Sequence, residues 1–140
     1  MEVREGMSRV VLTLGRGHTL RAAAKQMTER GVGAAVVLDE EEPGPGIISE
    51  RDILRSLGQG QDPDVERVGD HMTDSMITAA PGWSLERAAV EMSRRHIRHL
   101  VVVEGPELVG VLSMRDIVRC WTSAGATSGM TPPDRESSSV

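Results

Sequence analysis

Aromatic side chains are almost missing from this sequence. Of its 140 residues none is Phe or Tyr, and the only Trp residues are Trp83 and Trp121. A hydrophobic core must therefore be built from Val, Leu, Ile, Met and Ala. Proteins that bind single-stranded nucleic acids stack bases on aromatic side chains, so the composition disfavours that class of function.

Cysteine is equally scarce, because Cys120 is the only one. A single cysteine excludes an internal disulfide and is typical of a thiol-reducing compartment. The sequence contains no apolar run near the roughly 18 residues that a membrane span needs. Its first residues lack the basic and then apolar pattern of a secretion signal. We therefore expect a cytoplasmic protein that is not embedded in a membrane.

Basic residues are outnumbered by acidic ones, and 16 Lys and Arg against 21 Asp and Glu give a formal net charge of -5. Nonspecific affinity for nucleic acid depends on a basic surface that neutralises phosphates. The balance of charge therefore makes nucleic acid an unlikely partner. Local arginines can still bind a small anion.

The sequence repeats itself once. Leu20 recurs as Leu85, an offset of 65, and Asp52 recurs as Asp116, an offset of 64. The other identical pairs include Met7 and Met72, Ala23 and Ala88, Met27 and Met92, Val36 and Val101, Gly46 and Gly110, and Arg55 and Arg119. A two-copy repeat of this length predicts two units related by a pseudo-twofold axis.

Both copies predict the same order of elements: strand, helix, strand, strand, helix. The first helix of each copy begins after a good capping residue, Thr19 or Ser84, and carries Leu, Ala, Ala and Met at the spacing of one buried helical face. Gly31 can end the first of these helices in the left-handed conformation. Strands are expected around Leu12, over 34–38 and over 46–48, and in the second copy around Ile77, over 99–103 and over 110–112.

The repeat divides the chain into three parts. Residues 1–60 form the first repeat and residues 61–121 the second. Residues 122–140 are rich in Ser, Gly and Pro and contain too little apolar surface to order themselves, so they predict a disordered tail.

The most informative motif is Gly, two apolar residues, Ser, any residue, Arg and Asp, found at 46–52 and again at 110–116. One interpretation is a capping box, in which Ser and the Asp three residues later satisfy each other's backbone N–H groups. The other is a ligand site, because a junction from strand to helix directs N–H groups and the positive end of a helix dipole at a phosphate. In that interpretation Ser and Arg contact phosphate and Asp accepts the hydroxyls of a ribose.

The doubled motif, the segment 97–102 and the segment 70–78 together carry a resemblance. From Met7 to Trp121 the sequence resembles a tandem pair of cystathionine-β-synthase (CBS) domains, a Bateman module. The resemblance implies an α/β fold of the α+β kind, with two tandem β-α-β-β-α repeats in pseudo-twofold symmetry. Their three-stranded sheets would pack against each other, with helices outside, and leave two clefts for adenosine-containing ligands.

The resemblance also implies roles for individual residues. Asp52 and Asp116 would hold ribose hydroxyls, while Ser49 and Ser113 would contact phosphate. The remaining candidates are Thr13 and Thr78 near the base or phosphate, Val32 and Ile97 against the base, and Arg51 and Arg115 beside phosphate. An exposed ion pair to a neighbouring acid is the alternative role for each arginine. The copies differ where the second strand begins, with Gly33–Ala34 against Arg98–His99, so equivalent clefts are not expected.

With this resemblance, we expect a freestanding regulatory module that is not an enzyme and requires no cofactor. Its ligand would be AMP, ADP, ATP or a related adenosyl compound, which would favour one arrangement of the two repeats and so signal to an unidentified protein partner. A homodimer is expected. The alternative is a constitutive dimerisation or scaffold module, in which the motif is only a helix cap.

Three further sets of residues could carry chemistry. His71, His96 and His99 could bind a metal, but they span a helix end and a strand start without a supporting acid cluster. Asp70 and His71 near Ser75 lack the surroundings of a hydrolase nucleophile, and Cys120 is better explained as a small packed side chain than as a redox group. No metal ligand or catalytic residue is assigned.

Overall fold

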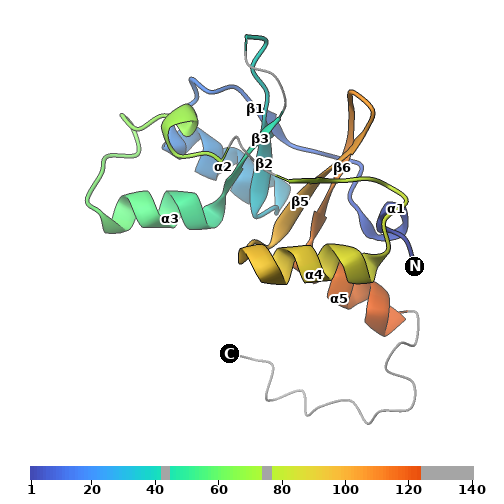
Figure 1. The fold of residues 1–140 in the computed structure, drawn as a ribbon. Coiled ribbons are helices and arrows are strands. Elements are labelled where there is room, and N and C mark those ends of the chain that lie inside the picture. Colours follow the sequence, from blue (N-terminus) through green and yellow to red (C-terminus); the bar gives the residue numbers. More distant parts are fainter. Residues whose placement is uncertain (42–44, 74–76, 124–140) are drawn as a thin grey trace, which may run out of the picture.

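Two three-stranded sheets lie side by side at the centre of the molecule, and the longer helices lie toward the outside (Figure 1). The computed structural model describes residues 1–41, 45–73 and 77–123. The predicted tail covers residues 122–140, but Thr122 and Ser123 are the last residues of a helix that packs in the second repeat. The rest of that tail, and Ser75, fall outside the described residues. The α+β fold with two tandem repeats is confirmed.

The first repeat contains β1 (Thr13–Leu14), α2 (Leu20–Arg30), β2 (Ala34–Val37), β3 (Gly46–Ser49) and α3 (Glu50–Gly58). The second contains β4 (Thr78–Ala79), α4 (Leu85–Arg95), β5 (His99–Glu104), β6 (Glu107–Ser113) and α5 (Met114–Ser123). A short helix α1 (Val3–Gly6) precedes the first repeat, and the 3-10 helix η1 (Val68–Asp70) lies between the two.

The first helix of each repeat, α2 or α4, begins as the sequence predicts. The Thr19 hydroxyl accepts a hydrogen bond from the Ala22 N–H at 3.1 Å, and the Ser84 hydroxyl accepts one from the Arg87 N–H at 3.0 Å. Gly31 ends α2 in the left-handed conformation with φ of 66°. His96 adopts the same conformation, with φ of 55°, at the end of α4, which the sequence did not indicate because residues other than glycine adopt it only in a few per cent of cases.

Each sheet has one parallel and one antiparallel pair of strands. β1 pairs with β2 in parallel and β2 pairs with β3 antiparallel, and β4, β5 and β6 repeat this arrangement. The first strand of each repeat begins at Thr13 or Thr78, one residue later than the predicted centre at Leu12 or Ile77. Leu12 still joins the ladder, because its carbonyl accepts the Val36 N–H at 2.9 Å.

Each repeat receives a segment that precedes the other repeat in the sequence. We call residues 1–8 arm 1 and residues 66–73 arm 2. Val3 of arm 1 is fully buried in the core of the second repeat, with Leu85 and Ile117. Val68 of arm 2 is fully buried in the core of the first repeat, with Leu20 and Ile48. The predicted boundary at residue 60 assigns each arm to its own repeat by sequence. In the structure each arm packs in the core of the opposite repeat.

Backbone hydrogen bonds hold both arms in equivalent positions. The Val3 N–H donates to the Trp83 carbonyl at 2.7 Å, as the Val68 N–H donates to the His18 carbonyl at 2.8 Å. Further along, Ser8 of arm 1 forms an antiparallel bridge with Val111 of β6. Thr73 of arm 2 forms the matching bridge with Ile47 of β3.

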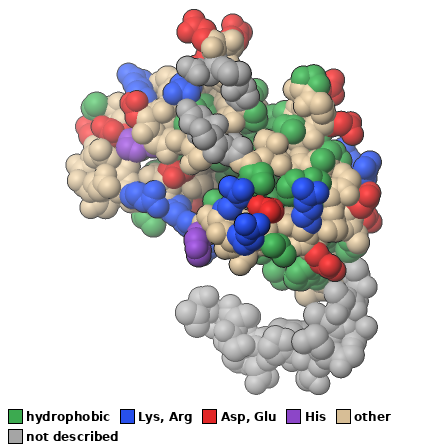
Figure 2. Space-filling view, in the orientation of Figure 1, with side chains coloured by type: hydrophobic (Ala, Val, Ile, Leu, Met, Phe, Trp, Pro, Cys, Tyr) green, Lys and Arg blue, Asp and Glu red, His purple; other side chains and the backbone are tan. Residues whose placement is uncertain are grey.

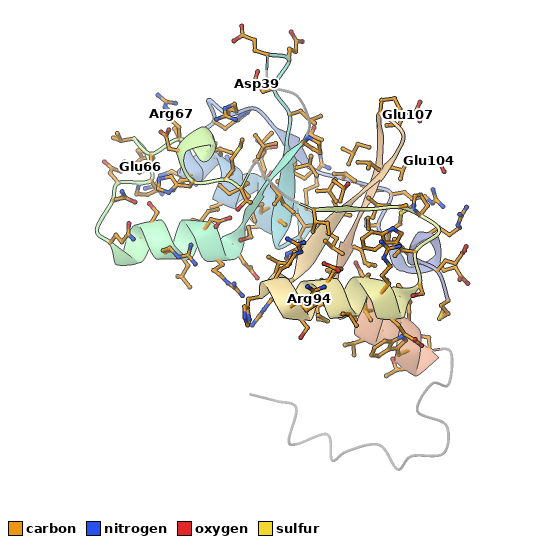
Figure 3. All side chains as sticks on the ribbon, viewed as in Figure 1. Asp39, Glu66, Arg67, Arg94, Glu104 and Glu107 are labelled. Atoms are coloured by element: carbon orange, nitrogen blue, oxygen red, sulfur yellow. The ribbon has the colours of Figure 1, made fainter. Side chains whose placement is uncertain are left out.

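Acidic side chains mark the tips of both hairpins, at Asp39 in the first repeat and at Glu104 and Glu107 in the second (Figure 3). Basic side chains gather over α4 around an acidic one (Figure 2). Glu91 pairs there with Arg94 at 3.4 Å and with Arg95 at 3.0 Å, so this basic cluster is partly neutralised. Within 1–41, 45–73 and 77–123, no helix is long and apolar enough to cross a membrane.

The contact between arm 1 and β6 leaves no space for a side chain at Gly110. A Cβ there would lie 2.7 Å from the Ser8 carbonyl oxygen and 2.9 Å from the Met7 sulfur. Gly110→Ala should therefore lower the free energy of unfolding by about 1–3 kcal/mol, the usual range for overpacking, measured by urea denaturation.

Two other glycines serve as controls. Gly46→Ala should be less costly, because its nearest neighbour is the flexible end of Met72 at 3.0 Å. Gly17→Ala, with nothing within 4 Å, should change stability by no more than about 0.5 kcal/mol. A Gly110→Ala protein as stable as the wild type would contradict the close approach of arm 1.

Candidate functional site

A cavity of about 620 Å³ is lined by residues of both repeats. One wall is the chain from Ser8 to Leu12, which leads from arm 1 into β1. A second wall is the turn from α2 into β2, residues 31–34. The opposite side is formed by β6 and the first turns of α5, including Ser113 and Asp116. The cavity therefore exists only where the two repeats meet.

Ser113 and Asp116 bond to each other at the start of α5. The Asp116 Oδ2 accepts the Ser113 N–H at 2.9 Å, and the Ser113 Oγ accepts the Asp116 N–H at 3.0 Å. This is the reciprocal geometry of a capping box. The capping role of the motif is therefore confirmed. The same two side chains also line the cavity, so they belong to the candidate site as well.

The second carboxylate oxygen of Asp116 has a partner of its own. Its Oδ1 lies 2.9 Å from Nη1 of Arg119, one turn later on α5. An ionised carboxylate offers about four acceptor positions. Asp116 can therefore hold Ser113 and Arg119 and still accept a hydrogen bond from a ligand hydroxyl.

Charges of both signs line the cavity, with positive charge in excess. Arg98, Arg115 and Arg119 contribute three guanidinium groups, against the two carboxylates of Glu50 and Asp116. Glu50 comes from α3 of the first repeat, whereas the other four belong to the second. An anion with polar hydroxyl groups matches this arrangement better than a cation does.

His99 also lines the cavity, at the start of β5. Burial lowers its pKa, because it disfavours the charged imidazolium. The carboxylates of Glu50 and Asp116 oppose this shift, and the guanidinium groups of Arg115 and Arg98 add to it.

The structure brings four of the predicted site residues to this cavity: Val32, Ser113, Arg115 and Asp116. Ser49 and Asp52 lie in the equivalent position of the first repeat. The Asp52 Oδ2 accepts the Ser49 N–H at 2.8 Å and the Ser49 hydroxyl at 3.0 Å. This second capping box is confirmed as well.

Arg51 reaches the other repeat, where its Nη1 donates to the His96 carbonyl at 3.1 Å. That contact places the start of α3 beside the segment that contains Ile97. Thr13 is exposed on β1, and Thr78 is half-buried on β4. The residues that line the cavity, among those the structure describes, include neither threonine.

Sequence reasoning missed several residues of the cavity wall: Val10, Val11, Glu50, Met114 and Arg119. Arg119 had a detectable signal, because it recurs as Arg55 at the same offset as the motif. Val10 and Val11 had none, since nothing in a local pattern shows that the chain crosses between two repeats there.

The three histidines considered for a metal site do not come together. His71 pairs with Glu66 at 2.8 Å in arm 2, His96 ends α4, and His99 lines the cavity. In the described part of the chain no group of three His, Cys, Asp or Glu side chains is arranged to hold a metal ion. Cys120 is buried in the core of the second repeat.

Comparison with known proteins agrees with this architecture. The sequence model of the CBS domain matches residues 2–59 and again residues 68–122. The chain belongs to the CBS domain family. The matched segments cover both capping-box motifs and residues 2–8 and 68–73 of the two arms. They also include every residue that lines the cavity.

Curated relatives of this CBS pair come from distant organisms. The CBS domain-containing protein YhcV of Bacillus subtilis is 32% identical over 131 residues, 92% of each chain. The mitochondrial CBS domain-containing protein CBSX3 of Arabidopsis thaliana is 39% identical over 106 residues. That match covers 72% of this chain and 52% of the plant protein, so the CBS pair spans about half of its length.

Solved structures repeat the fold. A putative signal-transduction protein with CBS domains from Burkholderia ambifaria is 31% identical, with a TM-score of 0.77 over 88% of each chain. The CBS domain protein PAE2072 of Pyrobaculum aerophilum, complexed with AMP, is 33% identical, with a TM-score of 0.75 over 88% of this chain and 99% of that one. Adenosyl ligands are thus known in structural relatives.

The burial of His99 predicts the direction in which its pKa is shifted. By NMR, its imidazole should titrate below the ordinary histidine pKa of about 6.5, because burial disfavours the charge. The folded state then binds fewer protons than the unfolded state. Stability should therefore fall as pH decreases from about 6.5 toward the lowered pKa. A His99→Gln protein should lack this part of the pH dependence, and a His99 pKa at or above about 6.5 would contradict it.

Proposed function

We propose that this CBS pair is a regulatory module that binds an adenine nucleotide or related adenosyl compound between its repeats. The observation that carries the proposal is the position of the Ser113 and Asp116 capping box, whose side chains line a cavity that both repeats form. The AMP complex of the Pyrobaculum relative supports the ligand class. A second relative, at 25% identity, was solved with 5'-methylthioadenosine and S-adenosylmethionine.

The proposed contacts follow from the geometry of the cavity. Asp116 accepts the ribose hydroxyls through its remaining acceptor positions, and the Ser113 hydroxyl donates to a phosphate oxygen. Arg115 neutralises phosphate charge. Val32, with 38% of its surface exposed, covers one face of the base with apolar surface. No cofactor is required in this scheme.

A second cleft is proposed around the first copy of the motif. Ser49 and Asp52 would take the phosphate and ribose roles there, with Arg51 beside phosphate and Ile97 against the base. The contact of Arg51 with the His96 carbonyl supports this, because it joins the motif to the opposite repeat. Thr13 and Thr78 remain proposed as base or phosphate contacts.

Regulation without catalysis is part of the proposal. A relative, the arabinose 5-phosphate isomerase KdsD of Salmonella typhi, is 34% identical, but the match covers only 31% of that enzyme. A CBS pair can therefore accompany a separate catalytic part. In this chain the ligand would shift the arrangement of the repeats and so be sensed by a protein partner, in the cytoplasm.

The ligand site is tested by isothermal titration with AMP, ATP and S-adenosylmethionine. Asp116→Asn removes the charge but keeps an oxygen that can accept the Ser113 N–H. If Asp116 holds ribose, the affinity should fall at least about tenfold, the equivalent of about 1.4 kcal/mol. Under the scaffold alternative, the variant loses only capping energy, about 0.5–2 kcal/mol of stability, and no ligand binds the wild type.

Asp52→Asn is the matched control, because Asp52 occupies the same position in the other capping box. It should reduce the stoichiometry from two ligands to one if both clefts bind, and should leave binding unchanged if only the described cavity does. Unchanged affinity in Asp116→Asn would show that the ribose contact is wrongly assigned.

We also propose a homodimer formed through exposed apolar helix faces. Leu54 and Leu57 on α3 are 69% and 47% exposed, and their equivalents Val118 and Trp121 on α5 are 52% and 37% exposed. The recurrence of apolar side chains at equivalent exposed positions supports a shared contact surface. A structural relative, named a hexameric CBS-CP12 protein, shows that the fold assembles in at least one case.

Sedimentation velocity tests the dimer. Leu54→Glu places a charge in the proposed contact, so the dimer should dissociate at concentrations where the wild type is dimeric. Val65→Glu is the control, because Val65 is also exposed, at 62%, but lies outside the helices. A wild-type monomer, or a Leu54→Glu dimer as stable as the wild type, would contradict the proposal.

A further inference from the structure

Arg119 joins the candidate ligand site to arm 1. Its Nη1 lies 2.9 Å from Oδ1 of Asp116, and its Nη2 donates to the Gly6 carbonyl at 3.4 Å. Gly6 is the last residue of α1. One guanidinium group therefore contacts both the proposed ribose-binding carboxylate and the end of the arm.

Arm 1 is also continuous with the cavity wall. Ser8 exchanges two backbone hydrogen bonds with Val111, at 2.9 Å and 3.0 Å, and the chain then passes along the cavity through Val10, Val11 and Leu12. If arm 1 left the second repeat, this wall would move away from Asp116. The cavity would lose its shape.

Among the described residues, the first repeat does not show the matching link. Arg55 occupies the position of Arg119, yet in the described ranges no carboxylate lies within ion-pair distance of its side chain, although Asp52 is three residues earlier. Within 1–41, 45–73 and 77–123, the connection from motif to arm is therefore found in the second repeat.

We propose that ligand binding in this cavity and docking of arm 1 are coupled, with Arg119 as the positioning residue that connects them. The inference rests on the proposed function. It adds that ligand binding changes how firmly residues 1–8 are held against the second repeat. A ligand that contacts both Asp116 and the wall from Val10 to Leu12 binds best when arm 1 is docked. It therefore shifts the arm toward the docked state. By reciprocity, a partner that pulls arm 1 away releases the ligand.

Amide hydrogen exchange measures the coupling directly. Among AMP, ATP and S-adenosylmethionine, the compound that binds most tightly is added to saturation. Exchange at the Val3 and Ser8 amides, which bond to Trp83 and Val111, should slow by at least about fivefold. The Ala23 amide of α2 serves as the internal reference and should change less. If none of the three compounds binds, the proposed function fails. If one binds and arm 1 exchange is unchanged, only the coupling fails.

A variant at a residue that does not itself line the cavity separates coupling from direct contact. A Cβ on Gly6 would lie 2.8 Å from the buried Sγ of Cys120, and neither residue lines the cavity. Gly6→Ala should therefore loosen arm 1 and weaken ligand binding by at least about fivefold. Adding Cys120→Ala removes the clash and should restore the affinity to that of Cys120→Ala alone. Wild-type affinity in a Gly6→Ala protein with faster arm exchange would overturn the proposal.

Arg119→Gln tests the connecting residue itself. In the absence of ligand it should speed exchange at Val3 and Ser8, because the contact with the Gly6 carbonyl is lost, and it should reduce the protection that ligand adds. Arg55→Gln, the matched variant in the first repeat, should change neither quantity. Equal effects of the two variants on arm 1 would contradict a specific role for Arg119.

Discussion

The buried valine of each arm is the contact on which the rest of this structure depends. Val3 closes the core of the second repeat and Val68 closes that of the first, and both are fully buried. Burying a valine contributes about 1.5–3 kcal/mol, a large fraction of the stability of a small domain. Because each arm belongs in sequence to the opposite repeat, neither core is complete without the other. The repeats are therefore held in one arrangement although each has its own sheet.

That exchange also creates the candidate site. Each arm must cross from one repeat to the other before it enters the first strand, and the crossing from Ser8 to Leu12 forms a wall of the cavity. The opposite wall is the junction of β6 and α5, where a capping box orients Ser113 and Asp116. The same residues thus stabilise a helix and face a space between repeats. A ligand bound there would contact both repeats at once, so its affinity would depend on their relative position.

Much of this was predictable from sequence, because the relevant signals are local. The caps at Thr19 and Ser84, the left-handed Gly31 and both capping boxes follow from residue type and spacing. The duplication then placed the two motifs in equivalent positions. The arm exchange was not predictable, since burial of Val3 depends on residues more than 80 positions away. For the same reason the roles of Val10 and Glu50 became visible only in three dimensions, whereas Arg119 was marked in the sequence by its recurrence as Arg55. The sequence also placed the first strand of each repeat one residue too early, because a strand of two residues carries too little pattern to fix its ends.

Mapping ligand contacts by NMR locates the proposed adenosyl site directly. Backbone amide shifts of the isotopically labelled protein are followed while AMP is added. The largest saturable changes should fall on Ser113, Arg115, Asp116 and the turn around Val32, residues that are distant in sequence and share one cavity. Saturable changes centred elsewhere on the surface, or no change with any of AMP, ATP and S-adenosylmethionine, would contradict an adenosyl site between the repeats.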